Sequence, residues 1–201
     1  MAPPTRWESD SADGHSHRYV ARFRALAAEG ADLVGEARLV DAMAAPGSRI
    51  LDAGCGPGRV GAALPERGHQ VVGVDADPVL VAAAVEDHPG PRWLVADLAE
   101  LDLPALGVAE PFDAVVCAGN VLVFVAPGTE RDVLRRLAAH LVPDGFAVLG
   151  FATDRDYGLG SFDVDLREAG FVLEHRFATW DLRPWGDDAD FAVSVLRRPK
   201  A

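Results

Sequence analysis

The sequence predicts an α/β fold in which a mostly parallel β-sheet lies between layers of helices. One observation is the segment 50–61, ILDAGCGPGRVG, which has the order of a strand, a glycine-rich turn and the start of a helix. Another is that the apolar runs 70–75 and 92–97 each end on an aspartate and are separated by a helical pattern. Strands that alternate with helices form βαβ units. Ligands bind such sheets at the carboxyl ends of the strands, where we expect the site.

The composition is typical of one globular domain. The 201 residues are 49% hydrophobic and 25% charged. We divide the domain into a mobile tail (1–14), an N-terminal helical cap (15–46) and a core (48–201). No apolar stretch approaches the roughly 20 residues that cross a bilayer, and the first residues do not resemble a signal peptide. We therefore expect a cytoplasmic protein with no membrane partner, as a monomer or a homodimer.

Charge and metal-ligand spacing argue against two kinds of partner. The net charge is −12, from 19 basic and 31 acidic residues, and nucleic-acid affinity comes largely from Lys and Arg at phosphates. We therefore expect no nucleic acid partner. Two cysteines, Cys55 and Cys117, form no disulfide framework and are expected to be buried reduced thiols that line one pocket. His15 and His17 are a poor metal signature, so we predict no metal site.

Two helices are predicted before the first strand, over residues 16–28 and 32–45. In one interpretation they cover a face of the sheet. In the other, the first helix closes over the cofactor and carries acceptor-binding residues, because closing a site excludes water and orders the reactants. His17, Tyr19 and Phe23 are the candidates in that case.

The elements after the glycine turn follow from apolar periodicity and from helix-end signals. The first helix is interrupted by Pro65 and ends at Gly68. Asp77 precedes Pro78 and is expected to cap the next helix. The later elements are a strand in 112–120, a helix over 129–141, a strand within 141–151, a helix over 161–169, and two apolar runs at 171–180 and 190–196.

Two glycine patterns overlap in the turn and predict different cofactors. Gly56, Gly58 and Gly61 fit G-x-G-x-x-G, the dinucleotide fingerprint, and Asp75 lies where an acid would hold a ribose. In the second pattern, Asp52 precedes Gly54 in an acid-x-G-x-G-x-G turn. A carboxylate there would repel a pyrophosphate, whereas it suits a ligand with an ammonium and a sulfonium.

The second pattern resembles motif I of the class I S-adenosylmethionine-dependent methyltransferases, and three later motifs extend the resemblance over about residues 48–152. The resemblance implies a Rossmann-like three-layer sandwich with a mostly parallel seven-stranded sheet and a C-terminal antiparallel strand. It also implies S-adenosylmethionine as cofactor. Asp52, Gly54, Cys55 and Gly56 would hold its methionine end.

The later motifs imply the rest of the cofactor site. Asp75 would bind the ribose hydroxyls, Ala76 would pack beside the adenine, and Asp97 with the Leu98 amide would meet the adenine edge. Cys117 and Ala118 would lie against the cofactor, and Gly119 would face the transferred methyl. Asp75 and Asp97 each have a simpler alternative as helix caps.

The acceptor and the reaction are less constrained. Candidate acceptor residues are His17, Tyr19, Asn120 and Arg155, although Asn120 could instead be a turn residue bonded to its own backbone. The Asn/Asp-Pro-Pro-aromatic signature of DNA-base amino-methyltransferases is missing after 117. We expect methyl transfer to a small molecule by in-line displacement, and no catalytic residue is assigned. The alternatives are a non-catalytic S-adenosylmethionine-binding module and an NAD(P)-dependent oxidoreductase.

Overall fold

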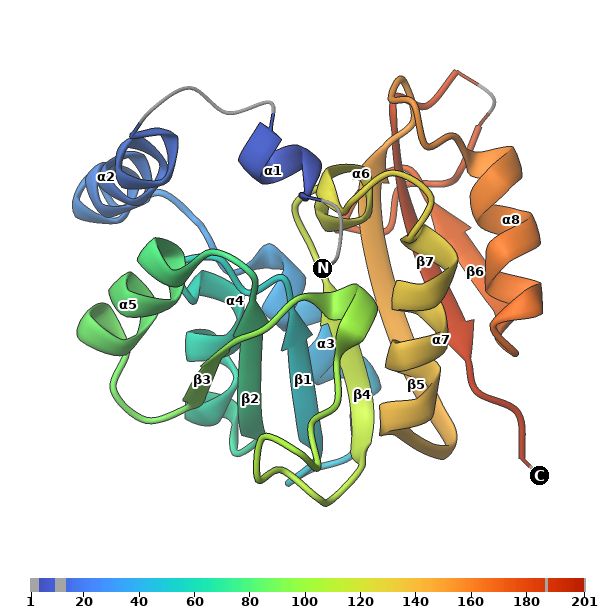
Figure 1. The fold of residues 1–201 in the computed structure, drawn as a ribbon, viewed down its shortest axis with the longest axis horizontal. Helices are drawn as coiled ribbons and strands as arrows, with labels where there is room; N and C mark the ends of the chain where they lie inside the picture. Colours follow the sequence, from blue (N-terminus) through green and yellow to red (C-terminus); the bar gives the residue numbers. More distant parts are fainter. Residues whose placement is uncertain (1–3, 10–13, 187, 201) are drawn as a thin grey trace.

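A seven-stranded sheet runs through the middle of the protein (Figure 1). The structure, a computed structural model, describes residues 4–9, 14–186 and 188–200. The strands are β1 (Arg49–Ala53), β2 (Gln70–Asp75), β3 (Arg92–Val95), β4 (Phe112–Cys117), β5 (Leu141–Ala152), β6 (Val172–Phe177) and β7 (Phe191–Arg197). Their order is β3-β2-β1-β4-β5-β7-β6, and β7 runs antiparallel to both its neighbours. The mostly parallel sheet with one antiparallel C-terminal strand is confirmed.

Helices cover both faces of the sheet. They are α1 (Arg6–Ser9), α2 (His15–Ala28), α3 (Gly35–Met43), α4 (Arg59–Ala63), α5 (Pro78–Asp87), α6 (Val121–Phe124), α7 (Glu130–His140) and α8 (Leu159–Glu168), with 3-10 turns η1 (Pro65–Arg67) and η2 (Leu98–Glu100). Helices α7 and α8 pack with η2 on one face, and α3 and α4 pack on the other. None of these helices, within the part of the chain that the structure describes, is long and apolar enough to cross a membrane.

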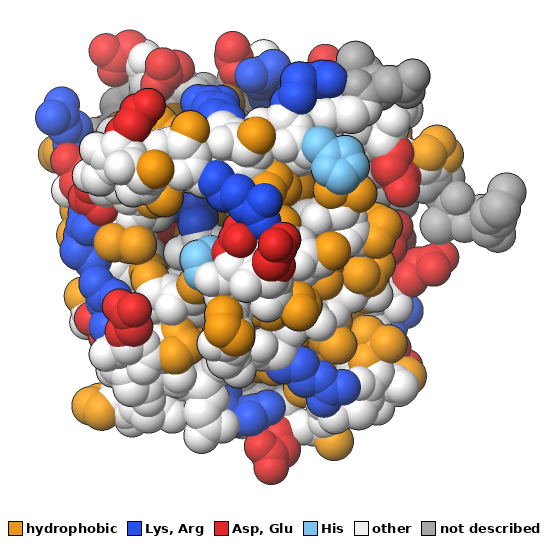
Figure 2. All heavy atoms as spheres, turned by 90° about the vertical axis from the view of Figure 1, so that its left-hand side faces the viewer, with side chains coloured by type: hydrophobic (Ala, Val, Ile, Leu, Met, Phe, Trp, Pro, Cys, Tyr) orange, Lys and Arg blue, Asp and Glu red, His pale blue; other side chains and the backbone are white. Residues whose placement is uncertain are grey.

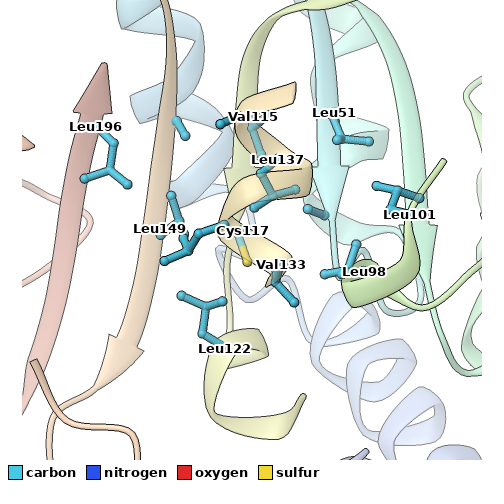
Figure 3. Close-up of a cluster of buried hydrophobic side chains, with 14 of the residues drawn as sticks. Leu51, Leu98, Leu101, Val115, Cys117, Leu122, Val133, Leu137, Leu149 and Leu196 are labelled. Atoms are coloured by element: carbon cyan, nitrogen blue, oxygen red, sulfur yellow. The ribbon is translucent and has the colours of Figure 1, made fainter. Parts of the chain in front are cut away.

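The alternation of side chains along the strands separates the two cores. Ile50 belongs to the cluster under α3 and α4, whereas Leu51 belongs to the cluster under α7 and α8. Figure 3 shows the second cluster, in which Val115 and Cys117 of β4 point the same way. Successive residues of a strand face opposite sides, so two continuous apolar faces result from one buried run.

Local signals in the sequence determined several helix ends. Helix α4 ends at Ala63 and η1 begins at Pro65, as expected where proline removes a helical N–H. Gly68 follows with φ +89°, which favours glycine. The Asp77 side chain accepts hydrogen bonds from the N–H groups of Val79 and Leu80 and caps α5, as predicted.

The N-terminal segment contains structure where we expected a mobile tail. Helix α1 lies between α2 and α6 across the carboxyl end of the sheet (Figure 1). The Arg6 guanidinium donates to the Val125 carbonyl at 3.2 Å and forms an ion pair with Glu130 at 3.0 Å. The rest of the predicted tail, 1–3 and 10–13, lies outside the described residues. The ion pair to α7 and the packing of Trp7 hold α1 against the domain.

Ion pairs also join α2 to α5 on the face that Figure 2 turns to the viewer. Arg24 contacts Glu86 and Asp87, each at 2.8 Å. Basic and acidic side chains lie among apolar ones on this face, without one large basic area.

Candidate cofactor site

A pocket opens where the carboxyl ends of β1, β2 and β4 meet the glycine turn. Its empty volume is about 860 Å³, including the open mouth. Of the predicted cofactor residues, Asp52, Gly54, Cys55, Gly56, Asp75, Ala76, Asp97, Leu98, Ala118 and Gly119 line it. The three strand-end carboxylates, at the ends of β1, β2 and β3, therefore face one space, because β2 pairs in parallel with both β1 and β3.

Asp52 lies at the floor of the pocket, near the end of β1. The residue is 1% exposed, and its Oδ2 accepts a hydrogen bond from the Gly61 N–H at 2.8 Å. Burial raises the pKa of Asp52 to about 7, against the opposing effects of that hydrogen bond and of the Arg59 charge. A carboxylate in this position gains from a cation beside it. The ammonium of a methionine group fits that requirement, whereas a pyrophosphate does not.

The glycine turn brings backbone close to the pocket. Gly54 has φ +76°, and a Cβ on it would lie 2.3 Å from Cγ2 of Val121, so only glycine fits here. The N–H groups of Gly54 and Cys55 both donate to the Val74 carbonyl, at 2.8 and 3.0 Å. The turn is thereby fixed against the end of β2.

Asp75 ends β2 and is also bonded to the turn. Its Oδ2 accepts the Gly56 N–H at 2.8 Å and its Oδ1 accepts the Asp77 N–H at 2.9 Å, while burial raises the pKa of the carboxyl. An ionised carboxylate has about four lone-pair sites. The Ala76 backbone also acts on this carboxyl, and the acceptor capacity that remains is available to a ligand hydroxyl. Asp75 does not cap α5, since Asp77 has that role.

Asp97 is both a helix cap and a residue of the pocket, which are the two interpretations that the sequence left open. Its Oδ1 accepts the Ala99 N–H at 2.9 Å and so caps η2, as the simpler interpretation predicted. The same residue lines the pocket beside Leu98. One carboxylate oxygen binds the backbone, and the other is left for a ligand.

The end of β4 corrects one prediction. Ala118 and Gly119 line the pocket, but Cys117 does not, and Figure 3 shows its side chain among Leu122, Val133 and Leu149. Cys117 faces the α7 core because strand residues alternate in direction. The prediction that both thiols line one pocket was therefore wrong for Cys117. Burial raises the pKa of this thiol, so it stays protonated.

The N-terminal helices form an aromatic wall of the pocket. Tyr19 and Phe23 of α2 line it as proposed, with ring centroids 4.8 Å apart. Trp7 of α1 lines it too, and its ring contacts Tyr19 edge-on at 5.4 Å and Phe124 at 5.7 Å. Sequence reasoning missed Trp7, because polar residues and prolines surround it. A large aromatic in such a segment is the signal that could have found it.

The structure does not bring His17 to the pocket. Its side chain is exposed, and the residue is not among the described ones that line the site. A helix turns about 100° per residue, so residues two apart face nearly opposite sides. Tyr19 faces the pocket, and His17 consequently faces away.

Asn120 and Arg155 are also placed elsewhere. The Asn120 side chain accepts the Ala152 N–H at 2.7 Å, which ties the turn after β4 to the end of β5 instead of bonding its own backbone. Arg155 is exposed and lies 3.5 Å from Asp154 in the loop after β5. Neither is among the described residues that line the pocket. The sequence positions of Asn120 and Arg155 predicted the correct end of the sheet, but they did not predict where the two side chains point.

Arg59 is a pocket residue that sequence reasoning did not identify. It is the first residue of α4, directly after Gly58, and its guanidinium contacts Glu36 of α3 and lies over the Phe23 ring at 5.6 Å. Val121 and Phe124 of α6 line the pocket as well. Within the described ranges, no group of three His, Cys, Asp or Glu side chains is arranged to hold a metal ion.

Known proteins resemble this chain over the region that builds the pocket. The sequence profile of a family described as "Methyltransferase domain" matches residues 50–145. The crystal structure of a TehB-like SAM-dependent methyltransferase from Corynebacterium glutamicum is 42% identical, with a TM-score of 0.86, over 94% of this chain and 100% of that one.

Two curated relatives match a shorter part. An uncharacterized methyltransferase of Mycobacterium tuberculosis is 40% identical over 119 residues, 57% of each chain. A magnesium-protoporphyrin O-methyltransferase of Rhodobacter capsulatus is 34% identical over 120 residues, 56% of this chain and 50% of that one. The chain thus spans little more than half the length of these relatives. The match to the C. glutamicum structure extends over that whole chain. Together with the glycine turn and the three strand-end carboxylates, it places this protein in the class I S-adenosylmethionine-dependent methyltransferase family.

Proposed function

We propose that this protein transfers a methyl group from S-adenosylmethionine to a small-molecule acceptor by in-line displacement. The observation that carries the proposal is that Asp52, Asp75 and Asp97, from three neighbouring strand ends, line one pocket. Three carboxylates suit a cofactor that is positively charged at its methionine end and has no phosphate. The same set opposes a dinucleotide.

Each carboxylate is assigned a part of the cofactor. Asp52 binds the ammonium of the methionine end, because it is buried and forms no ion pair with any of the residues that the structure describes. Asp75 keeps acceptor capacity for a ribose hydroxyl, and Asp97 has an oxygen left for the adenine amino group. Gly54, Cys55 and Gly56 approach the methionine end, Ala76 and the Leu98 amide flank the adenine, and Ala118 and Gly119 flank the methyl side.

The chain contributes mainly orientation and exclusion of water. Bound S-adenosylmethionine supplies a methyl group on a positively charged sulfur, which needs no further activation by the protein. Tyr19 and Phe124 line the pocket with aromatic rings, and the Trp7 ring contacts both. Alignment of two reactants can lower a barrier by roughly 7–11 kcal/mol, which is sufficient without a specialised catalytic side chain.

A small-molecule acceptor agrees with the size and the charge of the site. The pocket is narrowed by α1 and α2, and the chain carries a net charge of −12, which opposes a nucleic acid. The R. capsulatus relative is named for a small-molecule substrate. We further propose a single cytoplasmic domain, monomeric or homodimeric.

Calorimetry tests the cofactor, and turnover tests the catalysis. The protein is titrated with S-adenosylmethionine, S-adenosylhomocysteine and NAD. We expect the first two to bind and NAD not to bind; binding of NAD alone would overturn the proposal. Release of S-adenosylhomocysteine is then measured with phenols, amines and carboxylates as acceptors. Tight cofactor binding without turnover on any acceptor would instead support a non-catalytic binding module.

A further inference from the structure

Three aromatic side chains gather at the end of the cofactor pocket that α1 and α6 border (Figure 1). Trp7 of α1 lies 5.4 Å from Tyr19 of α2 and 5.7 Å from Phe124 of α6, measured between ring centroids. Both rings are nearly perpendicular to the indole, at 86° and 83°. Helix α6 follows the turn that contains Gly119, which is proposed to flank the transferred methyl group. The three rings therefore lie where an acceptor would meet that methyl group.

The polar groups beside these rings are already bonded within the protein. The indole Nε1 of Trp7 donates to Oδ2 of Asp77 at 2.8 Å. Thr5 also lines the pocket, and its hydroxyl donates to Glu8 at 3.1 Å and accepts the Glu8 N–H at 3.2 Å. Burial raises the pKa of the Tyr19 hydroxyl, which therefore carries no charge near neutral pH. Among the described residues, this end of the pocket consequently offers mainly aromatic surface.

The charge of the pocket favours a cation over an anion. Asp52, Asp75 and Asp97 line it, and the one basic residue of its described lining, Arg59, is already paired with Glu36 at 2.7 Å. The ammonium, sulfonium and carboxylate of S-adenosylmethionine leave the acids in excess. An anionic acceptor would have to leave water without a counter-charge, which is strongly unfavourable. A cation is instead attracted by the acids and by aromatic rings.

Methyl transfer to an amine creates no anion in such a pocket. The nitrogen lone pair forms the new N–C bond, the S–C bond breaks, and the electron pair of that bond stays on sulfur. The positive charge thus moves from sulfur to nitrogen. An amine that enters as the free base needs no protein group to remove a proton in this step.

We propose that the acceptor is a small amine with apolar substituents, and that Trp7, Tyr19 and Phe124 hold this amine and its positively charged methylated product. This inference rests on the proposed function and names its acceptor class. The hydrogen bond from the indole to the Asp77 carboxylate polarises the Trp7 ring, which strengthens its attraction for a cation. If the rings only pack α1 against the domain, the pocket will not distinguish a charged molecule from a neutral one of the same shape.

The first test measures binding without turnover. Calorimetry is carried out on the complex of the protein with S-adenosylhomocysteine. One probe is choline, which has a quaternary nitrogen, and the other is the neutral alcohol in which carbon replaces that nitrogen. We expect choline to bind about threefold or more tightly, as for a cation among aromatic rings. Equal affinities, or no binding of either probe, would overturn the inference.

Variants of one ring test its part in this preference. Phe124→Leu keeps an apolar side chain but loses the ring, so the ratio of the two affinities should fall toward one. Phe124→Tyr keeps the ring and should keep the ratio. Phe177→Leu is the matched control, because Phe177 is also partly buried but lies on the edge strand β6. Thermal unfolding shows whether each variant folds. If Phe124→Leu does not fold, the ratio in Trp7→Leu decides.

The second test compares three acceptors that share a benzyl group and differ in the nucleophile. They are N,N-dimethylbenzylamine, benzyl mercaptan and phenylacetate, and release of S-adenosylhomocysteine is measured at equal concentrations. We expect the amine to react about tenfold or more faster than the other two, since a thiolate or carboxylate must lose its hydration in a pocket lined by acids. Faster turnover of the thiol or the carboxylate would contradict the assignment.

Failure of this inference can be distinguished from failure of the proposed function. If S-adenosylhomocysteine does not bind the unmodified protein, the proposed function fails. If it binds while the two probes bind equally, or while the thiol or the carboxylate reacts fastest, methyl transfer stands and the amine class is wrong. If none of the three acceptors reacts, the preference for choline and its loss in Phe124→Leu decide.

Discussion

The indole Nε1 of Trp7 donates a hydrogen bond of 2.8 Å to Oδ2 of Asp77, across 70 residues of sequence. The same oxygen accepts a hydrogen bond from Ser16, and the other oxygen caps α5. The Asp77 N–H in turn donates to Asp75. One aspartate therefore joins the N-terminal helices to the strand end that is proposed to bind the ribose.

Removal of the indole donor should loosen the N-terminal cover. Trp7→Phe keeps an aromatic ring but loses the bond to Asp77, which contributes about 0.5–1.5 kcal/mol. We expect S-adenosylhomocysteine to dissociate several-fold faster, measured by stopped-flow fluorescence. Trp185→Phe, in a loop away from the pocket, is the control. Equal dissociation rates in Trp7→Phe and the unmodified protein would show that α1 does not limit release.

Asp75 is expected to be a main determinant of cofactor affinity. Asp75→Ala removes both acceptor oxygens and should weaken binding of S-adenosylmethionine by about 1–3 kcal/mol. Isothermal calorimetry measures the change. Asp113→Asn is the control, because Asp113 lies near the start of β4, at the opposite end of the sheet, and accepts the Arg49 N–H. Unchanged affinity in Asp75→Ala would remove Asp75 from the site.

Asp52 should make cofactor affinity depend on pH. In the ligand-free protein its pKa is about 7, so below pH 7 the carboxyl is largely protonated. Binding of the cofactor's ammonium favours the ionised form of Asp52. Below pH 7 the Asp52 carboxyl must therefore release a proton when the cofactor binds. Affinity should therefore rise with pH up to about 7 and then level off. Calorimetry in buffers of different ionisation enthalpy should detect proton release at pH 6.

The neutral variant Asp52→Asn checks the assignment. It should bind the cofactor more weakly at pH 8 and lose most of the pH dependence. At pH 8 the variant should also be more stable to unfolding than the unmodified protein. The raised pKa of Asp52 adds stability at low pH, and this stability is lost as the pH rises through about 7. Above that pH the folded protein holds a buried charge, which the amide avoids. Equal proton release in Asp52→Asn and the unmodified protein would assign the titration to another group.

Gly73 is expected to be required for packing rather than for chemistry. A Cβ on this residue of β2 would lie 2.2 Å from Cε3 of Trp93. Gly73→Ala should therefore lower the free energy of unfolding by about 1–3 kcal/mol, measured by urea denaturation. Gly160→Ala is the matched control, since a Cβ there meets nothing within 4 Å and alanine favours a helix. Equal stability of the two variants would contradict the close contact with Trp93.

Local sequence signals determined much of the fold and the centre of the site. The glycine turn, the aspartates at the ends of successive apolar runs and the Asp77 cap each depend on residues that are neighbours in sequence. Parallel strands bring their carboxyl ends to one edge. For that reason the order of the residues along the chain is sufficient to predict that Asp52, Asp75 and Asp97 lie together.

Tertiary structure alone decided which side chains complete the pocket. Trp7 and Arg59 reach it through contacts with distant elements, at Asp77 and Glu36, and the packing of helices is not encoded in sequence spacing. Cys117 and His17 were misplaced for the same reason, since a position near the site does not fix which face of a strand or helix meets it. The sequence thus determined the edge where the ligand binds. The packing of α1, α2 and α4 on that edge determined its walls, because those contacts depend on the geometry of whole elements.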